Sequence, residues 1–258
     1  MTKEQAIWEV NNFNNKIGNL NEQDGIDCPI CNNKAYVLEW FENDMNRDGE
    51  IEYDIKGKWC SCKSSRESKL RQLRSGMGEY LNKRAKDYIA NEEWQRKCKD
   101  LMMKYCCNDI DSDKWFIACG QSGCGKTLLI SIIANYLLNT YAKEVRYVTW
   151  IDFISKLKRD MMGDNVNRVS DYFEEIKNCE VLFIDEFLKI YNQTDLKYAI
   201  EIINYRYSNN LKTLITSERT FQELIDVDEA IIGRIKEKCK EYVINVPKDP
   251  NKNYRLKL

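Results

Sequence analysis

The sequence predicts an α/β fold in which helices cover both faces of a parallel β-sheet. Two observations predict this fold: short apolar segments alternate with helical ones from residue 114 onward, and a glycine-rich loop joins the first such strand to the first such helix. Strands that alternate with helices form parallel sheets. A third observation, a group of cysteines near the N-terminus, predicts a second and smaller domain. We expect that domain at residues 1–65 and the sheet domain at residues 66–258.

The bulk composition is typical of a soluble globular protein. Of the 258 residues, 43% are hydrophobic and 31% are charged, and no apolar segment reaches the roughly 18 residues that a membrane span needs. The N-terminus lacks the basic and then apolar layout of a secretory signal. We therefore expect a cytoplasmic protein without membrane contact. Its eleven cysteines, an odd number, suit reduced or metal-bound thiols better than a disulfide framework.

The charge is balanced overall but not along the chain. The net charge is −1, yet residues 56–99 hold thirteen basic and five acidic residues. Such an excess either binds a nucleic acid or an acidic partner, or belongs to a solvated basic helix, and both interpretations stay open. Histidine is absent from the sequence, so proton transfer near neutral pH has to use carboxylates, lysine, cysteine or water.

The expected elements follow from hydrophobic spacing. Residues 1–22 predict a polar helix. Strand-like segments at 35–41 and 50–55 flank a turn at 46–49 and predict a β-hairpin. Residues 63–105 predict basic helix, interrupted at 75–78. The expected strands of the sheet are 115–119, 145–150, 181–184, 213–216 and 242–246, and the expected helices between them are 126–141, 151–160, 170–178, 195–208 and 228–239.

Four cysteines in the first domain are spaced like zinc ligands. Two residues separate the first pair and one separates the second, and the predicted hairpin brings the pairs together. Four thiolates close the tetrahedral shell of Zn²⁺, so the metal would be structural. A redox-active dithiol is the alternative. Because about 65 residues bury little core, we expect this domain to need the metal to fold. The four residues are Cys28, Cys31, Cys60 and Cys62.

The loop after the first strand of the sheet, GQSGCGKT, matches the phosphate-binding pattern G-x-x-x-x-G-K-[ST] in full. Its glycines let backbone N–H groups surround the phosphates, and the helix N-terminus adds partial positive charge. We expect Lys126 to reach the β- and γ-phosphates and Thr127 to bind Mg²⁺. The residues of the loop are Gly120, Gln121, Ser122, Gly123, Cys124, Gly125, Lys126 and Thr127.

The segment VLFIDEF at 181–187 supplies two acidic candidates. Asp185 follows a buried strand, at the carboxyl edge where ligands bind in such sheets, and is a second magnesium ligand. Glu186 comes next and is the natural group to orient and polarise an attacking water. The pair favours hydrolysis of the γ-phosphate over its transfer to a small molecule, as a kinase would do.

Two later segments add weaker candidates. Thr216 and Ser217 end the strand of LKTLITSERT, where their hydroxyl groups could sense the γ-phosphate. Arg234 lies near the start of a late helix, from which it could stabilise charge on a neighbouring subunit's γ-phosphate. A surface arginine paired with a nearby carboxylate is the alternative for Arg234.

Taken in order, GQSGCGKT, VLFIDEF, TLITSERTFQEL and DEAIIGRI resemble the AAA+ ATPases of the DnaC/DnaI helicase-loader group, which also contains the IstB transposition helpers. The match is closest to loader-like proteins of phages and prophages and covers roughly residues 70–258. The resemblance implies a P-loop AAA+ core without a helical lid. It also implies that RSGMGEYL, before the phosphate loop, lies near the adenine pocket.

The resemblance implies a function as well. Loaders of this kind hydrolyse ATP, bind the replicative DNA helicase and grip single-stranded DNA, working as oligomers. By the same resemblance the zinc-binding domain docks on the helicase, Arg234 is an arginine finger, and Ser217 falls at or beside the sensor position. The family usually carries Asn there, which bears on the rate of hydrolysis. No residue after Arg234 matches a second, lid-borne sensor arginine.

Two related functions and one DNA-binding candidate stay open. A transposase helper of the IstB type shares the ATPase core but does not need the cysteine segment, and a non-hydrolysing ATP switch fits the changed sensor. Single-stranded DNA is read by basic groups together with aromatic rings. The segment 150–168 offers both, although an ordinary amphipathic helix is the alternative. Its candidates are Trp150, Phe153, Lys156, Lys158, Arg159 and Arg168.

Overall fold

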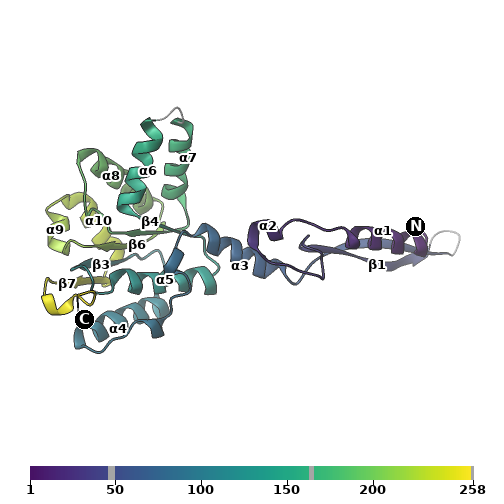
Figure 1. The fold of residues 1–258 in the computed structure, drawn as a ribbon, viewed down its shortest axis with the longest axis horizontal. Coiled ribbons are helices and arrows are strands. Elements are labelled where there is room, and N and C mark those ends of the chain that lie inside the picture. The colour runs from purple at the N-terminus through teal and green to yellow at the C-terminus, as the bar shows by residue number, and fades with distance from the viewer. Residues whose placement is uncertain (46–49, 163–165, 257–258) are drawn as a thin grey trace. The chain divides into compact units, whose positions relative to one another are not determined.

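The computed structural model of the protein describes all residues except 46–49, 163–165 and 257–258 (Figure 1). The chain divides into two compact units, which we call the N-terminal unit (Met1–Leu73) and the sheet unit (Arg74–Leu258). The boundary expected between residues 65 and 66 falls inside helix α3 (Lys63–Arg74).

The N-terminal unit is a helix packed on a β-hairpin, followed by a cysteine knuckle. Helix α1 (Lys3–Asn15) contacts both strands of the antiparallel pair, β1 (Tyr36–Met45) and β2 (Ile51–Trp59). The hairpin is confirmed, and its predicted turn at 46–49 lies outside the described residues. A second short helix, α2 (Asn21–Asp24), follows α1.

The single helix predicted over residues 1–22 is wrong, because the chain leaves the helix at Lys16. Gly18 donates its N–H to the carbonyl of Asn32 at 2.6 Å, which draws this segment against the first cysteine pair. A Cβ atom at Gly18 would lie 2.6 Å from the carbonyl oxygen of Asn33. The close approach of two backbones therefore requires glycine here.

The sheet unit alternates strands and helices as the sequence predicts. Among the residues described, its sheet has five strands, all parallel, in the order β4-β5-β6-β3-β7, so β6 separates β3 from β5. Short 3₁₀ turns are η1 (Gly78–Tyr80), η2 (Ala85–Asp87) and η3 (Pro250–Lys252). The strands and helices are α4 (Glu93–Asn108), β3 (Phe116–Gly120), α5 (Lys126–Thr140), β4 (Val145–Thr149), α6 (Trp150–Met162), α7 (Val166–Asn178), β5 (Val181–Asp185), α8 (Gln193–Ser208), β6 (Lys212–Ser217), α9 (Phe221–Ile225), α10 (Glu229–Cys239) and β7 (Val243–Val246).

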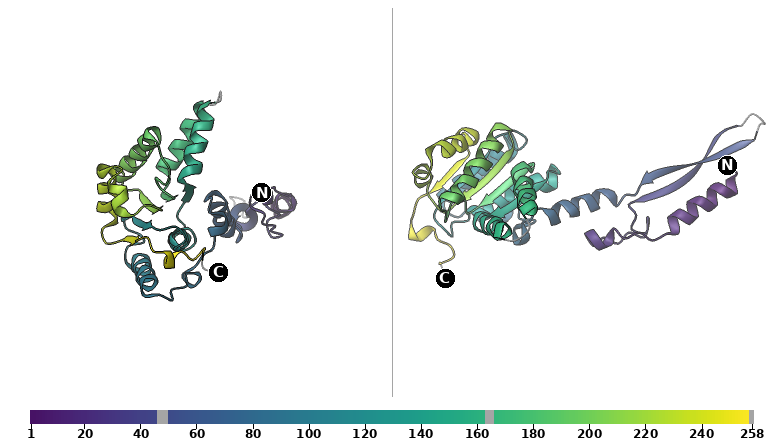
Figure 2. Two further views of the ribbon diagram at one scale, coloured as in Figure 1. Left: turned by 60° about the vertical axis from the view of Figure 1, so that its left-hand side comes forward. Right: turned by 90° about the horizontal axis from the view of Figure 1, so that it is seen from above.

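Helices cover both faces of the sheet, with α4 and α5 on one face and α6, α7, α8 and α10 on the other (Figures 1 and 2). Successive strand residues alternate between the two cores: Phe116 and Leu214 pack toward α5, and Ile117 and Ile215 pack toward α8 and α10. Burial on both faces explains why these strands are continuously apolar in the sequence.

The interruption predicted at 75–78 extends to residue 92. Ser75 accepts a hydrogen bond from the backbone N–H of Tyr147 at 2.7 Å, so the chain lies beside strand β4 instead of continuing α3. Gly76 and Gly78 have positive φ angles of 73° and 50°, which an α-helix cannot contain. The segment then runs through η1 and η2 before α4 begins.

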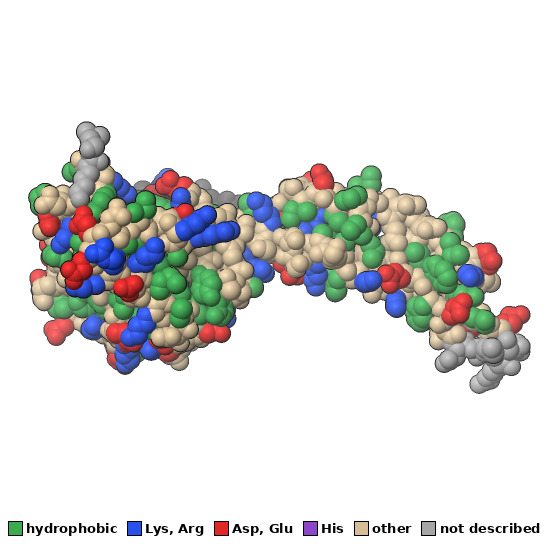
Figure 3. All heavy atoms as spheres, turned by 90° about the horizontal axis from the view of Figure 1, so that it is seen from below, with side chains coloured by type: hydrophobic (Ala, Val, Ile, Leu, Met, Phe, Trp, Pro, Cys, Tyr) green, Lys and Arg blue, Asp and Glu red, His purple; other side chains and the backbone are tan. Residues whose placement is uncertain are grey.

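The N-terminal unit exposes several large hydrophobic side chains. In the N-terminal unit Trp8 and Trp59 are 66% and 60% exposed, and hydrophobic side chains reach the surface there among charged ones (Figure 3). Within the described residues, no helix has the length and hydrophobicity that a transmembrane span requires.

Candidate functional site

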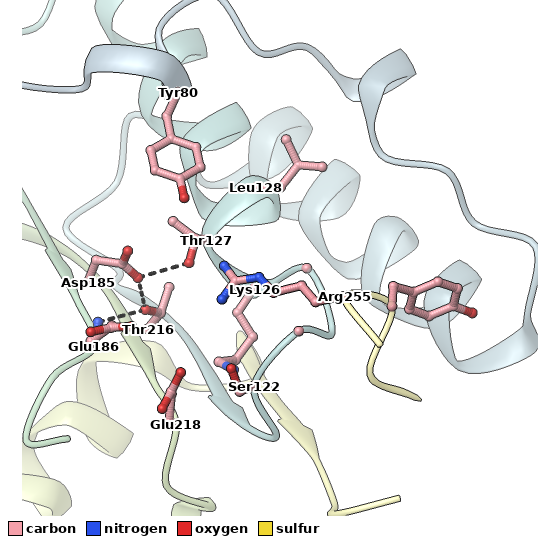
Figure 4. Close-up of a pocket in the computed structure, with 13 residues that line it drawn as sticks. Tyr80, Ser122, Lys126, Thr127, Leu128, Asp185, Glu186, Thr216, Glu218 and Arg255 are labelled. Atoms are coloured by element: carbon pink, nitrogen blue, oxygen red, sulfur yellow. Dashed lines mark hydrogen bonds between the residues drawn. The ribbon is translucent and has the colours of Figure 1, made fainter. Parts of the chain in front are cut away.

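A cavity of about 280 Å³ opens at the carboxyl edge of the sheet, over the N-terminus of α5 (Figure 4). The phosphate loop lines it with Ser122, Gly123, Gly125, Lys126 and Thr127. The other predicted loop residues, Gly120, Gln121 and Cys124, do not line the cavity.

Glycine is required where the loop approaches its neighbour. Gly120 has a φ of +107°, and a Cβ atom there would lie 1.9 Å from the carbonyl oxygen of Val246 on β7. Gly123 and Gly125 also have positive φ, which turns the backbone around the cavity. The loop geometry is thus the kind that presents backbone N–H groups to an anion.

Lys126 is buried and is held by its own loop. Its Nζ donates to the carbonyl oxygens of Gly120 at 2.8 Å and of Gln121 at 2.6 Å. The Cys124 thiol donates to the carbonyl oxygen of Gln121 at 2.9 Å, which fixes the same turn. The loop is therefore ordered around its lysine.

The Asp185 carboxylate accepts hydrogen bonds from three hydroxyl groups at the floor of the cavity. Its Oδ1 accepts hydrogen bonds from Thr127 Oγ1 at 3.1 Å and from Thr216 Oγ1, and its Oδ2 accepts one from Tyr147 at 3.0 Å. Burial and the adjacent Asp185 carboxylate raise the pKa of Tyr147, so this phenol stays protonated and donates. The Thr127 hydroxyl and the Asp185 carboxylate offer oxygens of the kind that Mg²⁺ prefers.

Glu186 lies beside Asp185 with a left-handed backbone φ of 56°. Thr216 Oγ1 accepts the N–H of Glu186 at 3.0 Å and so holds this unfavourable conformation. Lys189 Nζ forms ion pairs with Glu186 Oε1 at 3.0 Å and with Glu218 Oε2 at 3.1 Å. Burial opposes ionisation of Glu218, but hydrogen bonds from Lys189 and Ser122 outweigh it and lower the pKa of Glu218.

The structure brings Thr216, and not Ser217, to the cavity. Strand alternation places Thr216 on the α5 face together with Leu214, whereas Ser217 points to the opposite face. The Ser217 hydroxyl is fully buried and donates to the carbonyl oxygen of Phe187 at 2.8 Å. In this geometry the Ser217 side chain does not reach the nucleotide cavity, so it cannot sense a nucleotide there by direct contact.

Arg234 does not line this cavity. It lies on α10, where its guanidinium donates to the carbonyl oxygen of Ala230 at 3.1 Å and sits 6.0 Å from the ring centroid of Tyr207. Any contact of Arg234 with a γ-phosphate thus has to involve another copy of the chain.

The aromatic part of the DNA-binding candidate on α6 is wrong. Trp150 and Phe153 are each 1% exposed and pack in the core beneath the helix, so neither ring can stack on a base. Of the basic part, Lys156 pairs with Asp160, Lys158 pairs with Asp195, and Arg159 is exposed. The side chain of Arg168 lies outside the described residues.

Sequence reasoning assigned no site role to six residues of the cavity or its floor, which are Tyr80, Leu128, Tyr147, Glu218, Tyr254 and Arg255. Tyr80 and Glu218 line it from segments without strand or α-helix, and Tyr147 reaches Asp185 from β4. Arg255 points into the cavity from the segment after η3 (Figure 4). Two of these residues carried a signal: Tyr80 lies in RSGMGEYL, which the resemblance places near the adenine pocket, and Glu218 follows a strand that ends at the carboxyl edge of the sheet.

The four predicted cysteines come together in the N-terminal unit. Their Sγ atoms all lie within 4.8 Å of one another, with Cys28 3.7 Å from Cys60 and Cys31 3.6 Å from Cys62. Zn²⁺ with four sulfur ligands at about 2.3 Å has sulfur–sulfur edges of about 3.8 Å. The cluster fits a tetrahedral zinc ion.

Arg66 closes this cluster from helix α3. Its Nε donates to Cys62 Sγ at 3.3 Å, and its Nη1 donates to both carboxylate oxygens of Asp24 at 2.7 Å. Its Nη2 donates to the carbonyl oxygen of Ile26 and to Asn33 Oδ1. Arg66 and Asp24 are each 3% exposed, so a buried guanidinium holds a carboxylate and a thiol sulfur at once.

The parallel sheet, the phosphate loop at its carboxyl edge and Asp185 beside that loop define the class of protein as a P-loop ATPase. The family model of the bacterial DnaA ATPase domain matches residues 108–239. The chain belongs to this family of AAA+ ATPases, as its motifs predict, and the crystal structures of DnaC and DnaI share its fold.

Individual relatives agree with the family. In Bacillus subtilis (strain 168), YqaM is 34% identical over 53% of this chain and 44% of its own length. The phage-like element PBSX protein XkdC of the same organism is 33% identical over 62% of this chain and 55% of its own length. This chain thus spans about half the length of these relatives. The crystal structure of the DnaC helicase loader shares the fold, with a TM-score of 0.55 and 21% identity over 64% of this chain and 98% of that one.

Proposed function

We propose that this protein hydrolyses ATP and loads a replicative DNA helicase onto single-stranded DNA. The observation that carries the proposal is the meeting of Lys126, Thr127, Asp185 and Glu186 around one cavity, in a chain whose fold is that of the DnaC helicase loader. The four-cysteine cluster in a separate unit adds support, because a loader needs a second surface for its helicase.

The cavity residues divide the chemistry between them. Backbone N–H groups of the phosphate loop bind the phosphates, and Lys126 leaves its carbonyl partners to reach the β- and γ-phosphates. Thr127 and Asp185 hold the Mg²⁺ that neutralises charge on these phosphates. Glu186, released from Lys189, orients the water that attacks the γ-phosphate.

Thr216 connects the γ-phosphate to this arrangement. Its hydroxyl bonds Asp185 and its oxygen holds the N–H of Glu186, so a shift of Thr216 moves both carboxylates. We assign it the sensing role expected from the end of strand β6. Arg234 acts on the nucleotide of an adjacent copy, which makes hydrolysis depend on oligomerisation on DNA or on the helicase.

The N-terminal unit holds zinc through Cys28, Cys31, Cys60 and Cys62. The metal supplies structure and no open coordination position, because all four ligands are protein thiolates. We assign this unit the task of docking on the helicase. An IstB-like role as transposase helper is the competing function, and the loading experiment below separates the two.

The test is a helicase-loading assay on closed circles of single-stranded DNA, with the host replicative helicase and ATP. Wild-type protein is expected to raise the amount of helicase on circles at least tenfold. Glu186→Gln should bind ATP with unchanged affinity but lose more than 90% of turnover, since removing a general base costs about 10²–10⁴ in rate. Lys126→Ala should lose ATP binding. The control is Lys143→Ala, whose lysine pairs with Glu180 outside the cavity.

Each result has a distinct meaning. Wild-type protein that turns over ATP but places no helicase on DNA would contradict the loader function and favour the transposase helper. Normal turnover by Glu186→Gln would remove Glu186 as the base. ATP binding without any turnover, in the presence of DNA and helicase, would make the protein a non-hydrolysing switch.

A further inference from the structure

Strand β4 lies beside strand β5, which ends at Asp185. In the register of this pair, Tyr147 lies opposite Phe183, and Thr149 lies opposite Asp185. The Tyr147 side chain therefore has to extend two residues along the sheet to reach the carboxylate, and its hydroxyl donates to Asp185 Oδ2 at 3.0 Å. A tyrosine of the neighbouring strand thus contacts the acidic residue at the floor of the cavity.

The surroundings of Tyr147 hold its ring in place. The ring packs edge-on against Phe183, with the centroids 4.9 Å apart, and its centroid lies 5.9 Å from that of Tyr80, which lines the cavity. The backbone N–H of Tyr147 donates to the carbonyl oxygen of Ser75 at 2.7 Å. These contacts leave the hydroxyl little freedom to turn away from Asp185.

The buried Asp185 carboxylate is thereby held at both of its oxygens. Oδ1 accepts hydrogen bonds from Thr127 and Thr216 (Figure 4), and Oδ2 accepts the one from Tyr147. The three donors come from α5, β6 and β4, so together they fix the plane of the carboxylate as well as its position. Hydrogen bonds that orient a metal ligand in this way raise its affinity for the metal.

We propose that Tyr147 is a positioning residue for the magnesium ion that accompanies the nucleotide. The Asp185 carboxylate and the Thr127 hydroxyl offer oxygens of the kind that Mg²⁺ prefers, and the Tyr147 hydroxyl directs the carboxylate. Tyr147 is not among the described residues that line the cavity, so its effect on the metal has to pass through Asp185. This inference rests on the proposed nucleotide site.

The test is Tyr147→Phe in the full chain, which removes the hydroxyl and keeps the ring. Mn²⁺, which takes the same oxygen ligands as Mg²⁺, is titrated into the complex with ADP while electron paramagnetic resonance measures the free metal. Loss of a hydrogen bond to a ligand should lower Mn²⁺ affinity about tenfold to a hundredfold. The Mg²⁺ concentration for half-maximal ATP turnover should rise by the same factor, and turnover at saturating Mg²⁺ should approach the wild-type rate. ADP affinity in EDTA, measured by calorimetry, should stay within twofold of wild type.

The matched control is Tyr242→Phe. Tyr242 belongs to the hydrophobic core against which the Tyr147 ring packs, and its hydroxyl also donates to a carboxylate, that of Asp109. Neither Tyr242 nor Asp109 lines the cavity, so this change removes an equivalent hydrogen bond away from the metal site. Mn²⁺ affinity and the Mg²⁺ requirement should stay within twofold of wild type, even if urea unfolding shows that both variants lose stability.

Two results would overturn the role of Tyr147. One is Mn²⁺ affinity within twofold of wild type in Tyr147→Phe while Lys126→Ala loses ATP binding, in which case the proposed nucleotide site stands. The other is an equal loss of ADP affinity with Mn²⁺ and in EDTA, because a change in packing alone lowers both. Wild-type protein that binds neither ATP nor ADP would instead remove the proposed function itself.

Discussion

The two units of this chain reach an ordered structure in different ways. The sheet unit has two hydrophobic cores, one on each face of its sheet. In the N-terminal unit, the buried hydrophobic residues among those described are few and small, and half of them are cysteines. They are Ala6, Val10, Cys28, Cys31, Ala35 and Cys60.

This difference shows what the four thiols and Arg66 contribute. The N-terminal unit leaves Trp8 and Trp59 exposed, so little hydrophobic burial opposes the loss of chain entropy. Order there depends on the cysteine cluster and on the buried pair of Arg66 and Asp24. The sheet unit needs neither, because apolar side chains fill its interior.

The largest effect should come from breaking the cysteine cluster. Changing Cys60 and Cys62 to Ser removes half of the zinc ligands, and zinc-dependent domains unfold without their metal. We expect loss of one zinc per chain and loss of amide protection throughout residues 1–73. The sheet unit should keep its protection and its ATP binding. Hydrogen exchange with mass spectrometry, together with elemental analysis, measures both units in one sample.

Cys107→Ser is the matched control, because Cys107 is exposed and lies in α4 outside the cluster. It should change neither the zinc content nor the amide hydrogen exchange of either unit. If a chelator strips the zinc and residues 1–73 remain protected, the N-terminal unit does not depend on its metal and the contrast between the units fails.

A smaller effect should follow from Arg66→Met. This change leaves the Asp24 carboxylate buried without its partner, which costs about 3–5 kcal/mol, and removes the donor to Cys62. Loss of such a contact to a ligand lowers metal affinity about tenfold to a hundredfold. Competition with a zinc-binding dye measures the affinity, and hydrogen exchange shows whether the loss is confined to residues 1–73.

Lys69→Met serves as control, since Lys69 lies exposed on the same helix. The double variant with Asp24→Asn and Arg66→Met removes the unpaired carboxylate and should recover part of the stability, but not the zinc affinity. Unchanged affinity in Arg66→Met would restrict Arg66 to a role in folding.

Strongly patterned elements could be predicted from the sequence. The strands are apolar on both faces and the helices between them are regular, so the parallel sheet follows from their alternation, and the loop at Gly120–Thr127 follows from its glycine-rich pattern. The cysteine spacing also predicted the cluster, because pairs separated by one or two residues bend the chain so that their sulfur atoms converge.

Features that depend on register or on distant contacts could not be predicted. Strand β6 is buried at every position, so its sequence gives no sign that Thr216 rather than Ser217 faces the cavity. Arg66 lies in a basic helix and looked like a surface charge, whereas Asp24 stands 42 residues away. Arg255 lies in a segment without periodicity, and only the folded structure shows that it points into the cavity (Figure 4).

The smallest effect should test how well the sheet unit tolerates a buried charge. Lys212, at the start of β6, is 8% exposed, and its Nζ donates to the Tyr105 hydroxyl at 2.8 Å. Burial lowers the pKa of Lys212 from 10.5 to about 8. Between these values the unfolded chain holds a proton that the folded chain has lost, so stability rises with pH. Below pH 8 the folded chain bears the full free-energy cost of burying the charged form of Lys212, which has an upper limit of roughly 3 kcal/mol.

Lys212→Met should therefore raise the free energy of unfolding of the sheet unit by about 1 kcal/mol at pH 7, after the lost hydrogen bond is deducted. The Tyr105 hydroxyl keeps its own acceptor, the carbonyl of Lys114 at 2.7 Å, so no buried donor is left without a partner. The gain over wild type should shrink as pH rises toward 10.5. Urea unfolding at pH 7 and pH 10 measures this difference, with Lys143→Met as control. A destabilised variant at pH 7 would mean that the charge of Lys212 stabilises the fold, and that polar contacts matter inside the sheet unit as they do around Arg66.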